Sequence, residues 1–231
     1  MPLTVLVTGF GPFPGAPVNP TGALVRGLVK LRRPALADVR LVPHVFETSY
    51  RAVDRDLPHL IRKVQPDAVL MFGLSGKASC LRVETRARNA VSVLIRDADG
   101  QVISTGIVPG GRNALPFNVP AARLATAARK ARAMAIASRD AGRYLCNYLS
   151  WRAIEATAQP QGPVFAAFIH IPAVTGAARP RRDATGSTWG NPLCFDSPLG
   201  NAATYLAEDV PAWTKAHLQV DSDPAAWAIG G

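Results

Sequence analysis

The apolar residues of this chain fall into short continuous runs that alternate with longer stretches of helical periodicity. Short apolar runs between polar or turn residues are typical of buried strands, and they occur at 3–9, 38–46, 67–74, 133–138 and 164–172. Apolar residues spaced three and four positions apart predict helices at 19–31, 49–64, 119–132, 142–157 and 200–216. This alternation predicts an α/β fold with a mostly parallel, twisted central sheet and helices on both faces.

Local signals refine three of these elements. Asn19 is suited to cap the first helix, with Pro20 at its first position. Pro58 is expected to interrupt or kink the second helix, because proline has no backbone N–H to donate. Residues 80–100 alternate in polarity, which predicts an extended segment that ends in a turn.

The same pattern predicts a single domain. No internal repeat or low-complexity linker divides the chain, so we expect one α/β domain over residues 1–216 and a weakly structured tail over 217–231. Residues 175–192 are expected to form a long polar loop. The length of 231 residues, with 48% hydrophobic and 18% charged positions, suits one globular domain with a large core.

The cysteines narrow the class of protein. Cys80, Cys146 and Cys194 are odd in number and form no CxxC pair, so we expect neither a disulfide framework nor a metal site, and we expect a reducing compartment. The apolar run near the N-terminus lacks a basic flank and predicts a core strand rather than a signal peptide. Since no stretch has the roughly 18 apolar residues of a membrane span, we expect a cytoplasmic protein without a membrane partner.

The charge raises the question of nucleic acid as a partner. The net charge is +10 and the sequence pI is near 10.3, which is typical of many nucleic-acid-binding proteins. However, the basic residues are scattered, do not alternate with aromatic residues and match no known binding module. A basic solvated surface is therefore the favoured interpretation. Only the segment "RPRR" at 179–182 is dense enough to suggest a local site for an anion or a partner.

Cys146 is the first candidate for chemistry. A predicted strand ends at 138, a turn follows, and a helix begins within a turn of this cysteine. Partial positive charge at a helix N-terminus stabilises a thiolate, and the same N–H groups can stabilise an oxyanion. Taken alone, Cys146 is better explained as a buried helix residue.

His170 and Glu84 are the other two candidates. His170 lies near the end of a predicted core strand, where an imidazole could accept a thiol proton and deliver it to a leaving amine. Glu84 is followed by arginines at 86 and 88, which is usual for a surface ion pair, but a carboxylate can also orient an imidazole. Each residue alone has a structural explanation. Together they form a Glu, Cys, His set that does not yet select a reaction.

The loop "TGFGPFPG" at 8–15 suggests a binding role. Its glycines invite a dinucleotide-binding interpretation, but Pro12 and Pro14 remove N–H donors and the spacing is wrong. Phe10 and Phe13 are better suited to hold a flat apolar ring. Packing of the loop on the sheet is the competing explanation for both aromatic residues.

Four segments together resemble the pyroglutamyl peptidase I family of cysteine peptidases. The opening "VLVTGFGPFPG" at 5–15, with "NPT" at 19–21, resembles the N-terminus of that family. "ETRARN" at 84–89 resembles its E-x-x-A-x-N motif, "AGRYLCNYL" at 141–149 its A-G-x-x-x-C-N segment, and "FIHIP" at 168–172 its F-I-H-x-P segment. The segments occur in the family's order and at similar separations.

The resemblance implies a mechanism without a cofactor or metal. Cys146 would be the nucleophile, His170 the general base and acid, and Glu84 the orienting carboxylate. Phe10 and Phe13 would hold the lactam ring of an N-terminal pyroglutamyl residue. The substrates would be peptides that begin with pyroglutamate, hydrolysed through a thioester.

The resemblance has two further implications. Leu74, in the turn after the third strand, and Leu145, directly before Cys146, would also contact the substrate. Family members are often homo-oligomers, so a homo-oligomer is one expectation for this chain.

The chain also departs from the family. The turn after the third strand carries Leu74 and Lys77 where the family usually has a G-Q-A-G-G-like sequence. Leu94 falls where the family usually has an arginine near the active site, with Arg96 two positions away as a candidate substitute. The P-x-x-P-E-Q continuation is lost after Pro172. A divergent cysteine amidohydrolase with another acyl or lactam substrate, and a non-catalytic basic binding protein, remain alternative hypotheses.

Overall fold

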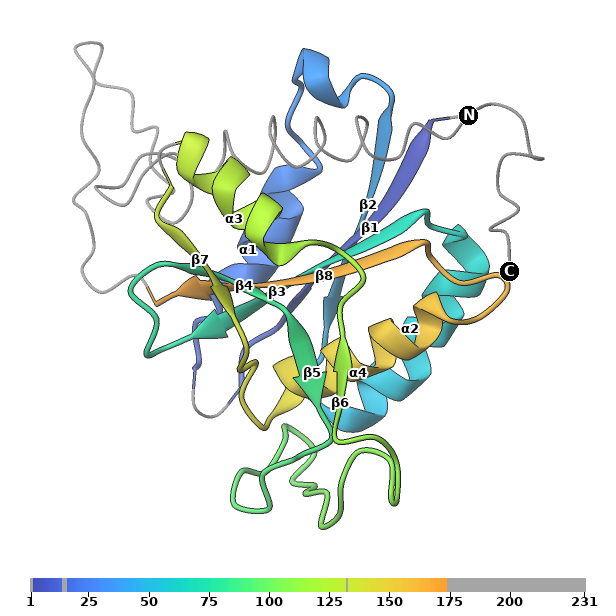
Figure 1. Ribbon diagram of the computed structural model, residues 1–231, viewed down its shortest axis with the longest axis vertical. Helices are drawn as coiled ribbons and strands as arrows, with labels where there is room; N and C mark the ends of the chain where they lie inside the picture. Colours follow the sequence, from blue (N-terminus) through green and yellow to red (C-terminus); the bar gives the residue numbers. More distant parts are fainter. Residues whose placement is uncertain (1, 14–15, 132, 174–231) are drawn as a thin grey trace.

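The computed structural model describes residues 2–13, 16–131 and 133–173 (Figure 1). In chain order the elements are β1 (Leu3–Phe10), α1 (Pro20–Leu28), the 3-10 helix η1 (Pro34–Leu36), β2 (Val39–Phe46), α2 (Tyr50–Val64), β3 (Ala68–Ser75), β4 (Leu81–Glu84), β5 (Arg86–Arg88), β6 (Ala114–Pro116), α3 (Ala121–Lys130), β7 (Ala135–Ser138), α4 (Leu145–Thr157) and β8 (Phe165–Pro172). The strands and helices expected before residue 173 are therefore confirmed, with ends shifted by a few residues.

Four expectations lie outside the described residues. They are the polar loop at 175–192 with its arginines at 179–182, the helix at 200–216, the end of the domain at 216 and the tail at 217–231. Each of these stays a prediction.

The central sheet has the strand order β2-β1-β3-β8-β4-β7. Neighbouring strands are parallel, except that β4 is antiparallel to β8. A separate two-stranded ribbon joins β5 to β6. The predicted α/β fold with a mostly parallel sheet is confirmed, and the antiparallel β8–β4 pairing places Glu84 on the strand beside that of His170.

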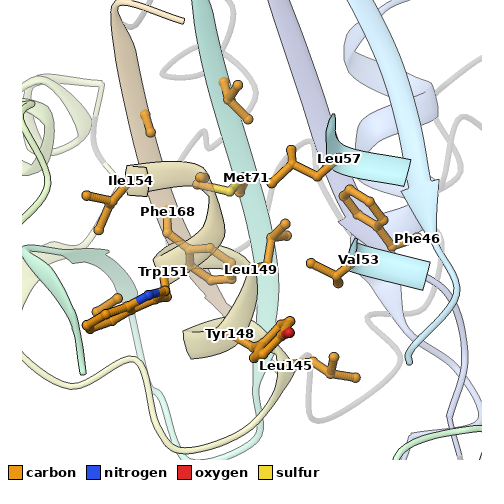
Figure 2. Packing of buried hydrophobic residues seen from close by; sticks show 14 of the residues in the cluster. Phe46, Val53, Leu57, Met71, Leu145, Tyr148, Leu149, Trp151, Ile154 and Phe168 are labelled. Carbon is orange, nitrogen blue, oxygen red and sulfur yellow. The ribbon is translucent and has the colours of Figure 1, made fainter. Parts of the chain in front are cut away.

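Helices cover both faces of the sheet, as expected. On one face α1 and α3 pack on Val5, Val7, Leu70, Phe72, Val83 and Ile169. On the other face α2 and α4 pack on Leu6, Val69, Met71 and Phe168. Figure 2 shows Leu149 of α4 between Met71 and Phe168 of the sheet and Val53 of α2. Because side chains alternate along a strand, His170 and Gly73 lie on the face that α2 and α4 cover.

The helix starts follow the sequence signals. The Asn19 side chain caps α1 by accepting a hydrogen bond from the Thr21 N–H at 3.1 Å, which confirms the predicted cap. Ser49 caps α2 in the same way, with its Oγ 3.1 Å from the Ala52 nitrogen. No described helix has both the length and the apolar character that crossing a membrane requires.

Two local expectations were only partly right. The helix α2 continues through Pro58 rather than being interrupted, because Val53, Leu57 and Ile61 bury one side of it against the core and compensate for one missing hydrogen bond. The segment 80–100 is extended only in β4 and β5, and residues 89–113 form a long loop.

The side chain of Asn89 explains why the strand ends there. Its Nδ2 donates to the Val108 carbonyl at 2.7 Å, and its Oδ1 accepts from the Val108 N–H at 2.9 Å. This side chain takes the place of a neighbouring strand and folds the loop back on itself.

We predict opposite effects for alanine at two glycines. A Cβ on Gly9 would lie 2.8 Å from the Thr21 carbonyl oxygen, whereas a Cβ on Gly27 of α1 would meet nothing within 4 Å. Gly9→Ala should therefore lower the free energy of unfolding by about 2 kcal/mol, by forcing α1 away from β1. Gly27→Ala should raise it by up to about 1 kcal/mol. Urea denaturation measures both, and equal effects would contradict the packing of α1 on β1.

Candidate active site

His170 and Glu84 form a buried pair across the β8–β4 junction. The Nδ1 atom of His170 lies 2.9 Å from Oε1 of Glu84, and the Glu84 side chain has no solvent exposure. The two residues are 86 positions apart in the chain. The pairing of β4 with β8 therefore brings together two of the three residues that the sequence singled out.

Cys146 reaches the same place from the first turn of α4. Gly73 of β3 is the direct neighbour of His170 in the β3–β8 register. A Cβ on Gly73 would lie 2.7 Å from Cys146 Sγ and 2.6 Å from Phe168 Cζ. The sulfur therefore sits over Gly73, beside His170, in a space that only glycine leaves open. Sequence reasoning did not identify this role of Gly73.

The surroundings of His170 favour its charged form. Burial lowers the pKa of this imidazole, but the charge of Cys146 and its hydrogen bond to the ring, followed by the Glu84 carboxylate, raise it, and the pKa reaches about 9. His170 is therefore protonated at neutral pH, between a sulfur and a carboxylate.

The start of α4 is anchored by Asn147, which is fully buried. Its Nδ2 donates to the carbonyls of Arg88 and Ala90, at 2.7 and 2.9 Å, and its Oδ1 accepts from the Arg88 N–H at 2.8 Å. These bonds tie the residue after Cys146 to the end of β5. Asn147 belongs to the A-G-x-x-x-C-N segment that the sequence analysis singled out. Its anchoring role depends on the contact between β5 and α4, which the sequence alone does not show.

The first N–H groups of α4 lack a side-chain cap. Tyr144 occupies the N-cap position and its side chain makes no capping hydrogen bond. The turn before it requires a glycine, because Gly142 has a φ of 81°. Uncapped N–H groups at a helix start are suited to bind an anionic oxygen, and here they lie beside the Cys146 sulfur.

The four residues that the resemblance assigned to substrate binding differ in how deeply their side chains are buried. Phe10 is 2% exposed, with its ring 6.0 Å from that of Phe46, and Leu145 is 1% exposed. Phe13 is half-buried on the loop after β1, and its ring lies 6.1 Å from that of Tyr144. Leu74 follows Gly73, so its side chain points to the opposite face of the sheet from Cys146. Phe13 and Tyr144 are therefore the aromatic rings nearest the surface of this site.

The loop 89–113 is attached to the segment before Cys146. The Tyr144 hydroxyl donates to the Arg96 carbonyl at 3.0 Å, and the Ser92 N–H donates to the Arg143 carbonyl at 2.6 Å. The Arg96 guanidinium donates to the Gly100 carbonyl inside its own turn, and Leu94 is 89% exposed. Arg96 is thus engaged in its own turn, and Leu94 is an exposed residue of the same loop.

A second charged side chain lies over the buried pair. The Arg82 guanidinium donates to Ser138 Oγ through Nη2 at 2.8 Å and Nε at 3.3 Å. Its Nε is 3.9 Å from Oε1 of Glu84. Sequence reasoning missed Arg82, since its orientation depends on the neighbours of β4. Among the described residues, no three histidine, cysteine or acidic side chains gather where a metal ion could bind.

Comparison with known proteins extends this picture. The family model described as pyroglutamyl peptidase matches residues 3–189. The chain is 37% identical over 172 residues to pyrrolidone-carboxylate peptidase 1 of Ralstonia nicotianae, covering 73% of this chain and 78% of that one. It is 34% identical over 184 residues to the pyrrolidone-carboxylate peptidase of Pseudomonas fluorescens, covering 76% and 83%.

A solved structure agrees with these sequence matches. The pyrrolidone carboxyl peptidase of Fervidobacterium islandicum superposes with a TM-score of 0.69 at 28% identity, covering 76% of this chain and 86% of that one. The residues matched by the family model include Glu84, Cys146 and His170. The chain therefore belongs to the pyroglutamyl peptidase family of cysteine peptidases.

Proposed function

We propose that this protein hydrolyses the amide bond that follows an N-terminal pyroglutamyl residue. Cys146 is the nucleophile, His170 the general base and acid, and Glu84 the carboxylate that orients the imidazole. The observation that carries the proposal is the buried imidazole of His170, which is hydrogen-bonded to Glu84 and lies beside Gly73, the residue over which the Cys146 sulfur sits. Membership of the pyroglutamyl peptidase family supports the same reaction.

The two ring nitrogens of His170 have separate tasks. Nδ1 is engaged by Glu84, so Nε2 is the nitrogen that exchanges a proton with the Cys146 sulfur. When the imidazole holds this proton, the Cys146 sulfur is a thiolate. The thiolate attacks the pyroglutamyl carbonyl carbon. The carbonyl oxygen becomes an oxyanion, and the uncapped N–H groups at the start of α4 stabilise it.

The remaining steps return the site to its first state. His170 donates its proton to the departing amine, the C–N bond breaks, and a thioester links the pyroglutamyl group to Cys146. Water then loses a proton to the imidazole and attacks the thioester. Pyroglutamate leaves, and the sulfur and imidazole share one proton again.

The lactam ring is proposed to bind on the β1 side of Cys146. A pyroglutamyl residue has no N-terminal ammonium, so aromatic walls and backbone hydrogen bonds suit it. The rings of Phe13 and Tyr144 form the outer wall. The buried side chains of Phe10 and Leu145 support this wall from the core, and the backbone at Leu74 borders it beside Gly73.

A related hypothesis has support from the exposed Leu94. The expected position of the family's arginine holds this exposed apolar side chain, which favours a cysteine amidohydrolase with another small acyl or lactam substrate. A panel of pyroglutamyl, prolyl and acetyl arylamides separates the two hypotheses. We also propose that the enzyme works in the cytoplasm, because Cys80 and Cys146 are free thiols that need a reducing environment. A homo-oligomer stays a prediction.

The first prediction concerns the nucleophile. Cys146→Ala should lower the rate of release of an arylamine from pyroglutamyl arylamide by roughly a thousandfold or more, because the thioester cannot form. Cys80→Ala should keep the rate, since Cys80 is the other free thiol among the described residues and lies before β4. Circular dichroism checks that both variants fold. Full activity in folded Cys146→Ala would contradict the mechanism.

The second prediction concerns the space under the sulfur. Gly73→Ala places a methyl group against Cys146 Sγ and Phe168, so it should lower kcat by about a hundredfold through displacement of the nucleophile. It should also destabilise the fold by about 2 kcal/mol. Gly76→Ala is the control, because a Cβ there meets nothing within 4 Å. Unchanged kcat in Gly73→Ala would contradict the position of the sulfur.

The third prediction concerns protonation. The carbon-bound ring protons of His170, followed by NMR, should titrate with a midpoint near pH 9. A negative neighbour favours the protonated ring, so its removal must lower the pKa of His170. Cys146→Ala should lower the pKa more than Glu84→Gln, because Cys146 contributes more to raising it. A midpoint that neither substitution moves would contradict the paired arrangement.

A further inference from the structure

Four side-chain positions form one row across the sheet at the level of the reacting groups. Gly73 of β3 pairs with His170 of β8, His170 with Arg82 of β4, and Arg82 with Ile136 of β7. Residues opposite each other in register point to the same face of a sheet. Arg82 and Ile136 therefore continue, beyond His170, the surface on which Cys146 lies over Gly73.

The position of His170 determines on which side of Cys146 the lactam ring and the departing residue of the substrate lie. The lactam ring is proposed to lie towards β1, against Phe13 and Tyr144. His170 must deliver its proton to the departing nitrogen, so the departing residue lies on the other side, over β8 and β4. The next side chain in that direction along the row is Arg82.

The surface on that side is open to solvent. The apolar core beneath α2 and α4 includes residues of β8 but none of the described residues of β4 or β7. The Arg82 side chain keeps 30% of its surface exposed, and Ile136 is 48% exposed. Neighbouring strands are about 5 Å apart, so one extended residue beyond the scissile bond reaches from His170 to the Arg82 guanidinium.

The Arg82 guanidinium is held in one orientation, but not all of its hydrogen-bond donors have a partner among the described residues. Ser138 accepts from Nε and Nη2, which fixes the plane of the group. The Glu84 carboxylate is 3.9 Å away and is already bound to His170. Within the described residues, no partner of Nη1 is found. Asp140, in the loop after β7, is bound to Arg88 rather than to Arg82.

We propose that Arg82 binds a carboxylate on the departing side of the substrate and gives the enzyme a preference for acidic leaving groups. This inference rests on the proposed function and names the substrate class within it. A fixed guanidinium with free donors matches a carboxylate. The carboxylate is either the free terminus of a pyroglutamyl dipeptide or the side chain of an acidic residue after pyroglutamate.

Two matched substrate pairs test the proposal. The first is pyroglutamyl-alanine and its C-terminal amide, and the second is pyroglutamyl-glutamic acid α-amide and pyroglutamyl-glutamine α-amide. In the unmodified enzyme, the acid of at least one pair should have a kcat/KM roughly tenfold above its amide. The pair that shows the difference identifies the source of the carboxylate.

Variants at Arg82 separate substrate binding from an effect on Glu84. Arg82→Gln should bring the acid-to-amide ratio close to one, and Arg82→Lys should keep part of it because the charge remains. Arg86→Gln is the control and should leave the ratio unchanged, since the Arg86 guanidinium donates to the Arg139 carbonyl.

Three outcomes would count against the proposal. An acid-to-amide ratio of one or less in the unmodified enzyme overturns it. Arg82→Gln that lowers the rates for acid and amide equally also overturns it, because Arg82 then acts only through Glu84 and His170. Absence of hydrolysis of all four pyroglutamyl substrates overturns the proposed function itself, and this inference with it.

Discussion

The hydrogen bond between His170 and Glu84 is the interaction on which the rest of the site depends. A carboxylate without solvent contact costs several kcal/mol unless a charged or hydrogen-bonding partner meets it. Glu84 is in this position, and His170 meets it at 2.9 Å. The pair in turn depends on the pairing of β4 with β8, since the two residues are 86 positions apart in the chain. The one antiparallel junction among the described strands of the central sheet is therefore where the proposed chemistry is located.

Cys146 is positioned by contacts on three sides. Below it, Gly73 lets the sulfur approach the sheet. Behind it, Asn147 ties the first turn of α4 to β5 through three hydrogen bonds. In front, Tyr144 links the same turn to the loop 89–113. These contacts fix the start of α4, so its uncapped N–H groups keep a constant position relative to the sulfur. Stabilisation of an oxyanion by preorganised dipoles requires such a fixed geometry.

The two sides of the proposed nucleophile differ in character, and the difference follows from the strand order. Towards β1 the surface is aromatic, with the ring of Phe13 near that of Tyr144, and Tyr144 packs on the core cluster that contains Phe10. Towards β7 it is polar and open, with Arg82 braced by Ser138. A substrate with an uncharged lactam on one side and a carboxylate on the other matches this division. The departures at Leu94 and Lys77 lie in surface segments and leave the three central side chains in place.

Local signals in the sequence were sufficient for the elements, since apolar runs, helical spacing and a capping residue such as Asn19 depend on near neighbours. Glu84, Cys146 and His170 were each ambiguous taken alone, and it was the resemblance of the segments around them to a known family that singled them out together. Tertiary structure alone decided that β4 runs antiparallel to β8, that Asn89 ends the strand at β5, that Phe10 is buried while Phe13 is not, and that Arg82 faces His170. Strand order and register depend on pairing between distant segments, and the periodicity of a single segment carries no record of the partner beside which it will lie.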